Sequence, residues 1–270
     1  MISIEELQTI APAAFTSTPA AHTSDRYQHV RTADIVERML DDGFVITHAS
    51  QQKTQNRSAH KAPHQKHRIR MRMPVNGEVT EMHRKLGNIF PTVDLINSGD
   101  WSSQLILALG LYRVVCENGM IAPFGNQNTM IKIRHDRITE DTTQAISQAV
   151  ESAPSLFEFA EACSHTYMKS DEIREYASQA ARLRWGMNED VSPVAAHIEG
   201  LMRARRVMDD KSDLWSVFNT VQENGTRGGF KVPDTNGKMR RLRSRSNIAQ
   251  DVDWNQELWN LTNDMQLALS

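Results

Sequence analysis

The segment from Pro91 to His135 constrains the fold most, because it reads as a strand, a buried helix, a sharp stop and another strand. Its apolar residues recur at intervals of three and four, the spacing of one helix face; they are Trp101, Leu105, Ala108, Leu109, Tyr112 and Cys116. Ser98 or Asp100 can cap the start of this helix, and Gly119 can close its end in the left-handed conformation. We therefore expect an α+β fold in which a small, mostly antiparallel sheet packs on a buried central helix.

Two predicted strands carry cations on one face and apolar side chains on the other. From His67 to Met73, arginines alternate with Ile and Met at the strand period, at positions Arg68, Arg70 and Arg72. Lys132 and Arg134 alternate with isoleucines in the same way. If the two strands share a sheet, their cations form a basic surface on a rigid support. A solvated outer face gives the same pattern, although like charges at this spacing repel one another unless anions lie opposite.

The whole chain divides into four predicted segments. Residues 1–24 begin with a short helix and continue as an Ala-, Thr- and Pro-rich arm or linker, and residues 25–136 form the α+β core. Residues 137–212 are poor in Gly and rich in Ala, Leu, Met, Glu and Arg, so we expect a helical subdomain in which Pro154 ends one helix. Residues 213–270 hold further helices and a basic loop or hairpin with Asn-Gly and Pro-Asp turn signals.

Charge is segregated along a chain whose net charge is only −2. Seven Lys or Arg residues and no Asp or Glu occur between Gly43 and Gly77. Between Arg227 and Gln250 there are seven more Lys or Arg residues and a single acidic residue, Asp234. Such segregation is the electrostatic footprint of a polyanion binder. No run is long enough to span a membrane, the acidic first residues differ from a secretory signal, and two distant cysteines suit a reducing compartment. These features predict a cytoplasmic protein.

Both basic regions supply candidate contacts to a polyanion. Arg227-Gly-Gly-Phe230 combines a cation, two permissive glycines and a ring that can stack on a base, although a solvated turn has the same composition. Tyr27 and Phe124 are further rings, each expected in the core. The candidate nucleic-acid-binding residues are Lys66, Arg68, Arg70, Arg72, Lys132, Arg134, Arg227, Phe230, Lys231, Arg240, Arg241 and Arg243.

Catalytic and metal-binding interpretations have less support. His60, His64 and His67 would share one face of a helix, but Pro63 lies between them and the neighbouring cations repel a metal ion. A metal-dependent nuclease needs clustered carboxylates, and Asp94 is the only residue that we offer as a ligand. The cysteine on the apolar stripe has the surroundings of a small hydrophobe. We therefore expect no catalytic residue, no cofactor and no bound metal.

Four motifs together resemble a known family. They are Lys66-His-Arg-Ile-Arg70, Leu111-Tyr-Arg-Val-Val-Cys-Glu-Asn-Gly119, Trp215-Ser-Val-Phe-Asn-Thr-Val-Gln-Glu-Asn224 and Asn255-Gln-Glu-Leu-Trp259. As a set they are similar to the phage- and plasmid-borne family known as domain of unknown function 932, over most of the chain from about Tyr27. The resemblance implies a mobile-element context and assigns no catalytic residue.

Phage single-strand annealing proteins offer an analogy for such a chain, since they combine a small α+β core with a basic groove. We expect a protein that binds single-stranded DNA in recombination and assembles into a homo-oligomeric ring or filament. The groove would hold the phosphate backbone, so binding would weaken steeply with salt. The alternative is a non-enzymatic anti-defence or regulatory protein whose basic surface binds an acidic partner.

Overall fold

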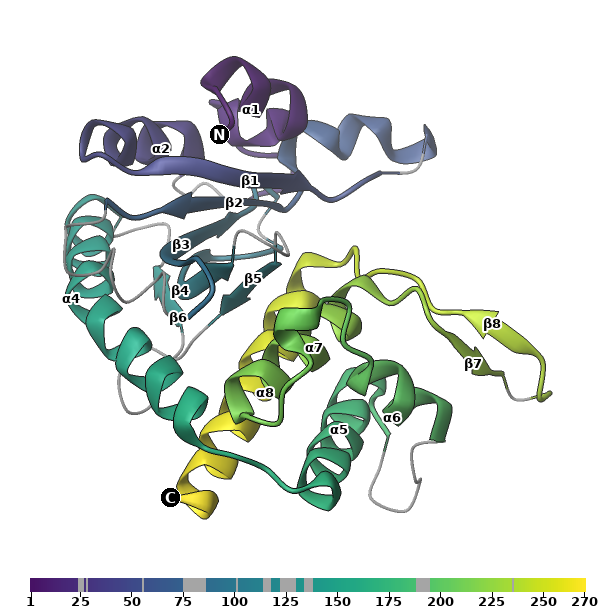
Figure 1. Cartoon of the computed structure of the whole chain (residues 1–270). Coiled ribbons are helices and arrows are strands. Elements are labelled where there is room, and N and C mark those ends of the chain that lie inside the picture. The colour runs from purple at the N-terminus through teal and green to yellow at the C-terminus, as the bar shows by residue number, and fades with distance from the viewer. Residues whose placement is uncertain are drawn as a thin grey trace. The chain divides into compact units, whose positions relative to one another are not determined.

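The computed structural model describes residues 1–23, 27, 29–54, 56–74, 86–100, 102–113, 118–121, 130–133, 138–187, 195–234 and 236–270. The chain forms two compact units, Met1–Leu156 and Phe157–Ser270 (Figure 1), which we call the sheet unit and the helical unit. Helix α4 (Ile138–His165) runs from one unit into the other, and Pro154, expected to end a helix, lies inside it. None of the helices in the described ranges is long and apolar enough to cross a membrane.

The sheet unit is built on a six-stranded antiparallel sheet. Its strands are β1 (Val45–Gln51), β2 (His67–Arg72), β3 (Ile89–Asn97), β4 (Leu105–Arg113), β5 (Asn118–Ile121) and β6 (Met130–Ile133). Strands β1 to β5 lie side by side in chain order, and β6 pairs with β4. An antiparallel sheet followed by a mainly helical C-terminal half confirms the predicted α+β class.

The buried central helix predicted between its cap, Ser98 or Asp100, and Gly119 is wrong, because Leu105–Arg113 is a strand. It lies inside the sheet, paired with β3 on one side and with β5 and β6 on the other. Five consecutive residues in its middle are buried, so apolar side chains occupy successive positions and also match the helical spacing. Ser98 and Asp100, the expected caps, accept backbone N–H groups within the turn between β3 and β4 instead. Gly110 is compatible with this strand and disfavours a helix.

The strand register gives the sheet two different faces. Ile69, Leu95 and Leu107 lie opposite one another on neighbouring strands and are fully buried. Directly opposite residues point to the same face of an antiparallel sheet, so these three form an apolar row. Arg70 and Asp94 lie opposite each other one position along, on the other face. Charged side chains are thereby concentrated on one side of the sheet.

Helix α2 (Thr32–Asp41) packs on the apolar face. The hydroxyl of Thr32 lies 2.8 Å from His67 Nε2 and accepts a 3.0 Å hydrogen bond from the amide of Asn97, which together anchor the start of the helix to β2 and β3. Helix α1 (Ile4–Ile10) lies beside β1 (Figure 1). The short helices η1 (Pro12–Phe15) and η2 (Asn56–His64) complete the first part of this unit.

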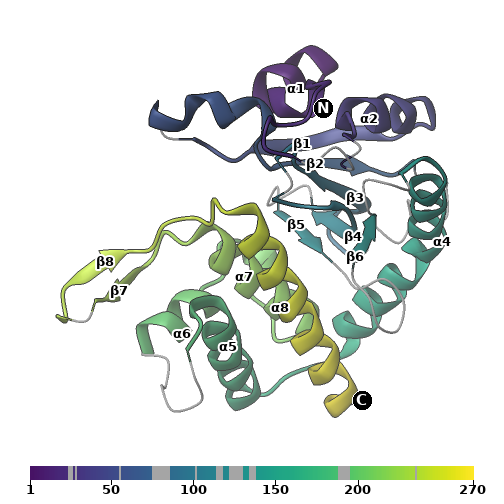
Figure 2. The same cartoon turned by 180° about the vertical axis from the view of Figure 1, so that it is seen from behind.

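The helical unit surrounds one buried helix. It contains α5 (Ser170–Trp185), α6 (Ala195–Met202), η4 (Val207–Asp209), α7 (Leu214–Arg227) and α8 (Ile248–Leu269). Helix α7 is buried from its first residue to Gly225 and contacts α5, α6 and α8. Strands β7 (Lys231–Pro233) and β8 (Met239–Arg241) follow α7 in the chain and form a separate antiparallel ribbon that extends away from the helices of this unit (Figure 2). Of the loop and the hairpin that the sequence left open, the structure has the hairpin.

Candidate functional site

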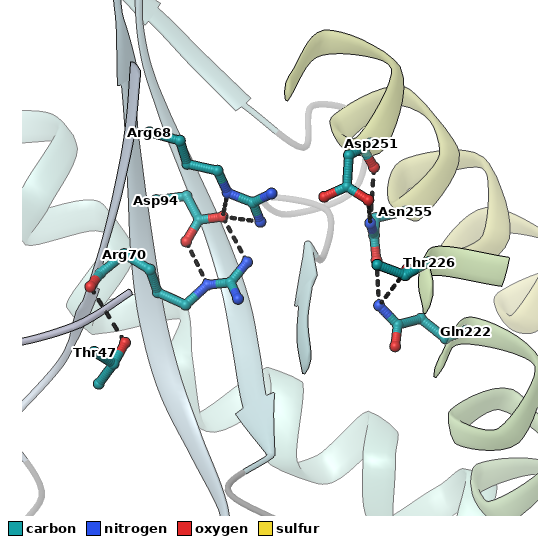
Figure 3. A network of polar contacts seen from close by, with 8 residues as sticks. All are labelled: Thr47, Arg68, Arg70, Asp94, Gln222, Thr226, Asp251 and Asn255. Atoms are coloured by element: carbon teal, nitrogen blue, oxygen red, sulfur yellow. Dashed lines mark hydrogen bonds and ion pairs between the residues drawn. The ribbon is translucent and has the colours of Figure 1, made fainter. Parts of the chain in front are cut away.

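Arg68 and Arg70 belong to a buried ion cluster and do not form an open basic surface. The Nε atoms of both arginines donate 2.6 Å hydrogen bonds to the carboxylate of Asp94, and Arg70 Nη2 adds a third at 2.8 Å (Figure 3). The three residues are only 6%, 3% and 2% exposed. The groove predicted along β2 is corrected in this respect, because Arg68 and Arg70 are buried and share one carboxylate that the neighbouring strand supplies.

The electrostatics of this cluster favour an ionised carboxylate. Burial alone would raise the pKa of Asp94, but the charges of Arg68 and Arg70 outweigh burial and lower it from 3.8 to about 2. Two guanidiniums already occupy the oxygens of Asp94, so this carboxylate makes a poor metal ligand. The described residues contain no group of three side chains able to hold a metal ion.

Other residues of the predicted β2 groove have different surroundings. The Arg72 guanidinium lies 4.7 Å from the centre of the Phe90 ring, in a cation–π contact, and Lys66 is half-buried. Residue 132 lies in the same register row as Arg68, through Ile96 and Ile106. The two strands therefore share a sheet, as the predicted basic face requires. The side chain of Lys132, the whole of Arg134, and Phe124 lie outside the described residues.

The histidines do not form the helical metal face considered from sequence. His67 is 1% exposed and bonded to Thr32, and burial lowers its pKa to about 4. His64 belongs to η2 and His67 begins β2. The imidazole of His67 thus fixes α2 to the sheet.

The ribbon β7–β8 buries one apolar residue and carries exposed cations on both faces. Val232 is buried, whereas Lys231 and Arg241 lie directly opposite each other and are both exposed. The backbone N–H of Leu242 donates to the Phe230 carbonyl and the Leu242 carbonyl accepts from Gly229, which continues the pairing beyond β8 and extends the alternation towards the exposed Arg243. We call Lys231, Arg241 and Arg243 the ribbon cations.

Arg240 and Phe230, also predicted as contacts, are engaged elsewhere. Arg240 donates a 2.6 Å hydrogen bond to Asp234 across the ribbon turn. The Phe230 ring packs edge-on against Trp185, and it lies so close to Gly200 that a Cβ there would come within 2.1 Å of the ring. Phe230 therefore anchors the ribbon on α5 and α6, and the interpretation of it as a free stacking ring is corrected.

The glycines of the predicted Arg-Gly-Gly-Phe segment let the chain fold back on itself. Gly228 has a φ of +60°, and a Cβ at this position would lie 2.9 Å from the carbonyl oxygens of Leu242 and Arg243. Gly229 has a φ of +92° and donates a 2.9 Å backbone bond to Leu242. Their small size serves the close approach of the strand that follows the ribbon.

A second group of cations surrounds the C-terminal end of α7. Arg205 donates hydrogen bonds to the Asn224 side chain and the Gly228 carbonyl, at 2.7 and 2.5 Å. Arg206 and Arg227 both pair with the buried Glu223. We call Arg203, Arg205, Arg206 and Arg227 the basal arginines. Part of their role is structural, because cations stabilise the negative end of a helix dipole.

The basal arginines gather near two acidic side chains. Arg206 pairs with both Glu223 and Asp209, and Arg227 also pairs with Glu223. Burial lowers the pKa of Arg205, Glu223 opposes this shift, and the three other basal arginines reinforce it. Four arginines so placed form a field that attracts anions.

Three of these four arginines were missed in the sequence. Asn224 explains their position, because its side-chain amide donates 2.9 Å bonds to the carbonyls of Leu201 and Arg203 and so holds the chain after α6 against α7. The Arg-Ala-Arg-Arg run at 203–206 is a weak signal by itself. Only the packing of α6 on α7 brings it next to Arg227.

Polar residues of α7 and α8 have a packing role. Gln222 donates a 2.8 Å hydrogen bond to Asn255, and Asn255 donates a 2.7 Å bond to the Asp251 carbonyl (Figure 3). These residues come from two of the four motifs noted above. The pair fixes the axial position of α8 relative to α7.

Comparison with known proteins places most of the chain within one family model. Residues 19–259 match the model described as domain of unknown function 932. The chain is also similar to two proteins of Escherichia coli strain K12. It is 27% identical to the UPF0380 protein YfjQ and 28% identical to the UPF0380 protein YafZ, each over 261 residues that cover 94% of this chain and 88% of the relative. No solved structure matches the chain.

Proposed function

We propose that this chain, which belongs to the family described as domain of unknown function 932, binds nucleic acid through its ribbon cations and basal arginines. In this proposal Lys231, Arg241 and Arg243 contact successive phosphates of one strand. The basal arginines add positive charge at the end of the ribbon that lies next to α7. The contact is with the backbone, so it carries affinity without reading base sequence.

The observation that carries the proposal is that Lys231 and Arg241 lie directly opposite each other on the two strands of the ribbon. Like charges directly opposite each other destabilise an antiparallel pair. In the described part of the chain neither cation forms an ion pair, although Arg241 Nε donates to the Gly229 carbonyl. A phosphate placed over the pair would turn their mutual repulsion into two charge-assisted contacts.

The recombination role expected from sequence extends this proposal. Single-stranded DNA is the ligand that an annealing protein would hold, with its bases left free and neighbouring protomers continuing the contact surface. The loss of Phe230 as a stacking ring favours backbone contacts over base stacking. Oligomer formation on DNA, detected by light scattering, would support the annealing role specifically.

Fluorescence anisotropy with labelled single- and double-stranded oligonucleotides tests the proposal. We expect salt-sensitive binding whose logarithmic slope falls by about 0.7 for each phosphate contact removed from a single strand. The variant Lys231→Glu is the sharpest probe, because it creates an attractive cross-strand pair with Arg241. It should stabilise the ribbon while weakening oligonucleotide binding, so that stability and affinity change in opposite directions.

A matched control is Arg174→Glu, which makes the same reversal at an exposed position of α5. It should leave binding nearly unchanged. No binding of either oligonucleotide at low salt would overturn the proposal and leave the acidic protein partner as the better explanation of the ribbon. Equal losses in Lys231→Glu and Arg174→Glu would show that only overall charge matters, which would also refute a specific contact at the ribbon.

A further inference from the structure

A cavity of about 450 Å³ lies within the helical unit, between the C-terminal end of α5 and the first half of α8. Two arginines, two tryptophans and two carboxylates line it: Arg184, Trp185, Arg245, Asp253, Trp254 and Glu257. Its volume lies within the range of small-molecule sites. So many charged and aromatic side chains around one cavity are unusual for packing alone.

The arginine wall has hydrogen-bond donors that the protein leaves unused. Arg184 donates from Nε to the Gly225 carbonyl at 2.6 Å, and its two terminal nitrogens bond no side chain or carbonyl within the described ranges. Arg245 donates to two backbone carbonyls through its terminal nitrogens, but its Nε is buried without a partner among the described residues. The same holds for the indole N–H of Trp254, a residue only 1% exposed. Buried donors of this kind normally have an acceptor.

The opposite wall offers acceptors. Asp253 and Glu257 lie four residues apart on α8, on one face of the helix. In the described ranges neither carboxylate forms an ion pair with Arg184 or Arg245, although all four residues line the same cavity. Burial and the charge of Asp253 raise the pKa of Glu257, and the charge of Arg245 partly opposes this rise.

We propose that this cavity binds a guanine base. Guanine is the base with two adjacent acceptors, O6 and N7, that suit the terminal fork of an arginine. Its neighbouring N1–H and N2–H groups are two donors that suit a carboxylate. A simple phosphate or carboxylate would satisfy the arginine wall but meet repulsion from Asp253 and Glu257. Adenine and the pyrimidines lack either the two adjacent acceptors or the two neighbouring donors.

Trp185 provides a flat surface on which a base can stack. Arg184 lies 5.5 Å from the centre of the Trp185 ring, and Arg245 lies 5.9 Å from that of Trp254. Trp185 is half-buried at the cavity wall, so part of its indole is open to a ligand. Stacking on an aromatic ring favours any base, because every base has a π face.

Where the guanine belongs to a bound strand, this site extends the proposed function and rests on it. Arg245 follows β8 by four residues, and its backbone N–H donates a 2.9 Å bond to Thr226 in the last turn of α7. The chain therefore leads directly from the ribbon to the cavity within one unit. An unstacked guanine of a strand held by the ribbon, or a free guanine nucleotide, presents the same base to the cavity.

Calorimetric titration with guanosine, adenosine and cytidine 5′-monophosphates tests the proposal on the full-length protein. All three share the phosphate, so any difference between them reports on the base. We expect guanosine monophosphate to bind at least tenfold more tightly than the other two. The double variant Asp253→Asn/Glu257→Gln should remove this preference while keeping the fold, as judged by circular dichroism. Arg184→Lys retains the charge but loses the fork, and should also remove it.

Arg174→Gln, on the same helix as Arg184, is the control and should bind like the unmodified protein. Titrations with a 15-mer of thymidine, with and without one central guanosine, separate the two sources of the base. Preference for the guanosine-containing strand places a strand's base in the cavity, and mononucleotide binding without that preference assigns it to a free nucleotide. Absence of any guanine preference overturns the inference. Lys231→Glu should weaken the oligonucleotide but not the mononucleotide, so failure of the ribbon proposal is recognisable separately.

Discussion

Replacement of Asp94 by Asn should destabilise the protein strongly, because Arg68 and Arg70 then lose their shared counter-ion inside the sheet unit. Both guanidiniums are more than nine-tenths buried. Removing one partner of a buried ion cluster typically costs about 3–5 kcal/mol, since uncompensated charge remains in a low-dielectric environment. We expect the urea midpoint, followed by circular dichroism, to fall accordingly. The control Asp234→Asn removes the partner of the exposed Arg240 and should leave the midpoint nearly unchanged.

The pH dependence of stability gives an independent check on the same cluster. The pKa of Asp94 is about 2 in the folded protein, below its ordinary value of 3.8. A lowered carboxyl pKa contributes stability that is present above pH 3.8 and is lost as the pH falls towards 2. Linkage puts this contribution at about 2 kcal/mol, and Asp94→Asn should remove it. The cluster would lose its assigned importance if Asp94→Asn cost under about 1 kcal/mol, or if its acid stability profile matched that of the unmodified protein.

Two further predictions concern the helical unit. Gly228→Ala combines an unfavourable positive φ with a Cβ 2.9 Å from two carbonyl oxygens, so it should cost about 1–3 kcal/mol. Gly186 also has a positive φ, but a Cβ added there meets none of the described atoms within 4 Å, so Gly186→Ala should cost less. Equal midpoints in urea for the two variants would refute the steric argument. Cys163 is 0% exposed, and this burial raises the pKa of its thiol to about 12. Iodoacetamide at pH 8 should therefore modify the Cys163 peptide only after unfolding, and rapid labelling of the folded protein, seen by mass spectrometry, would contradict this.

The sequence predicts the parts of the fold that depend on local patterns. Strand β2 follows from its period-two alternation, and the ribbon follows from the turn signals beside Asp234 and Gly237. Strand β4 was missed because burial on both faces removes the alternation that distinguishes a strand from a helix. Here neighbouring strands, and not the local spacing, determine the structure.

Less of the candidate site than of the fold could be predicted, because contacts between segments that are distant in the sequence determine it. The positive charge of Lys231, Arg241 and Arg243 is visible in the sequence, and their exposure on one ribbon face agrees with it. The burial of Arg70 was not predictable, because its partner Asp94 lies on another strand and only the register brings them together. The basal arginines likewise depend on how α6 packs against α7.

Ultraviolet cross-linking of an iodouracil-substituted oligonucleotide, mapped by mass spectrometry, tests the contact surface most directly. The account predicts cross-links within residues 227–245, centred on the ribbon, and their loss in Lys231→Glu under conditions where Arg174→Glu retains them. Met239, 53% exposed on the ribbon, is a suitable acceptor of such a cross-link. Cross-links confined to the sheet unit, particularly around residues 66–72, would contradict the assignment of nucleic-acid binding to the ribbon.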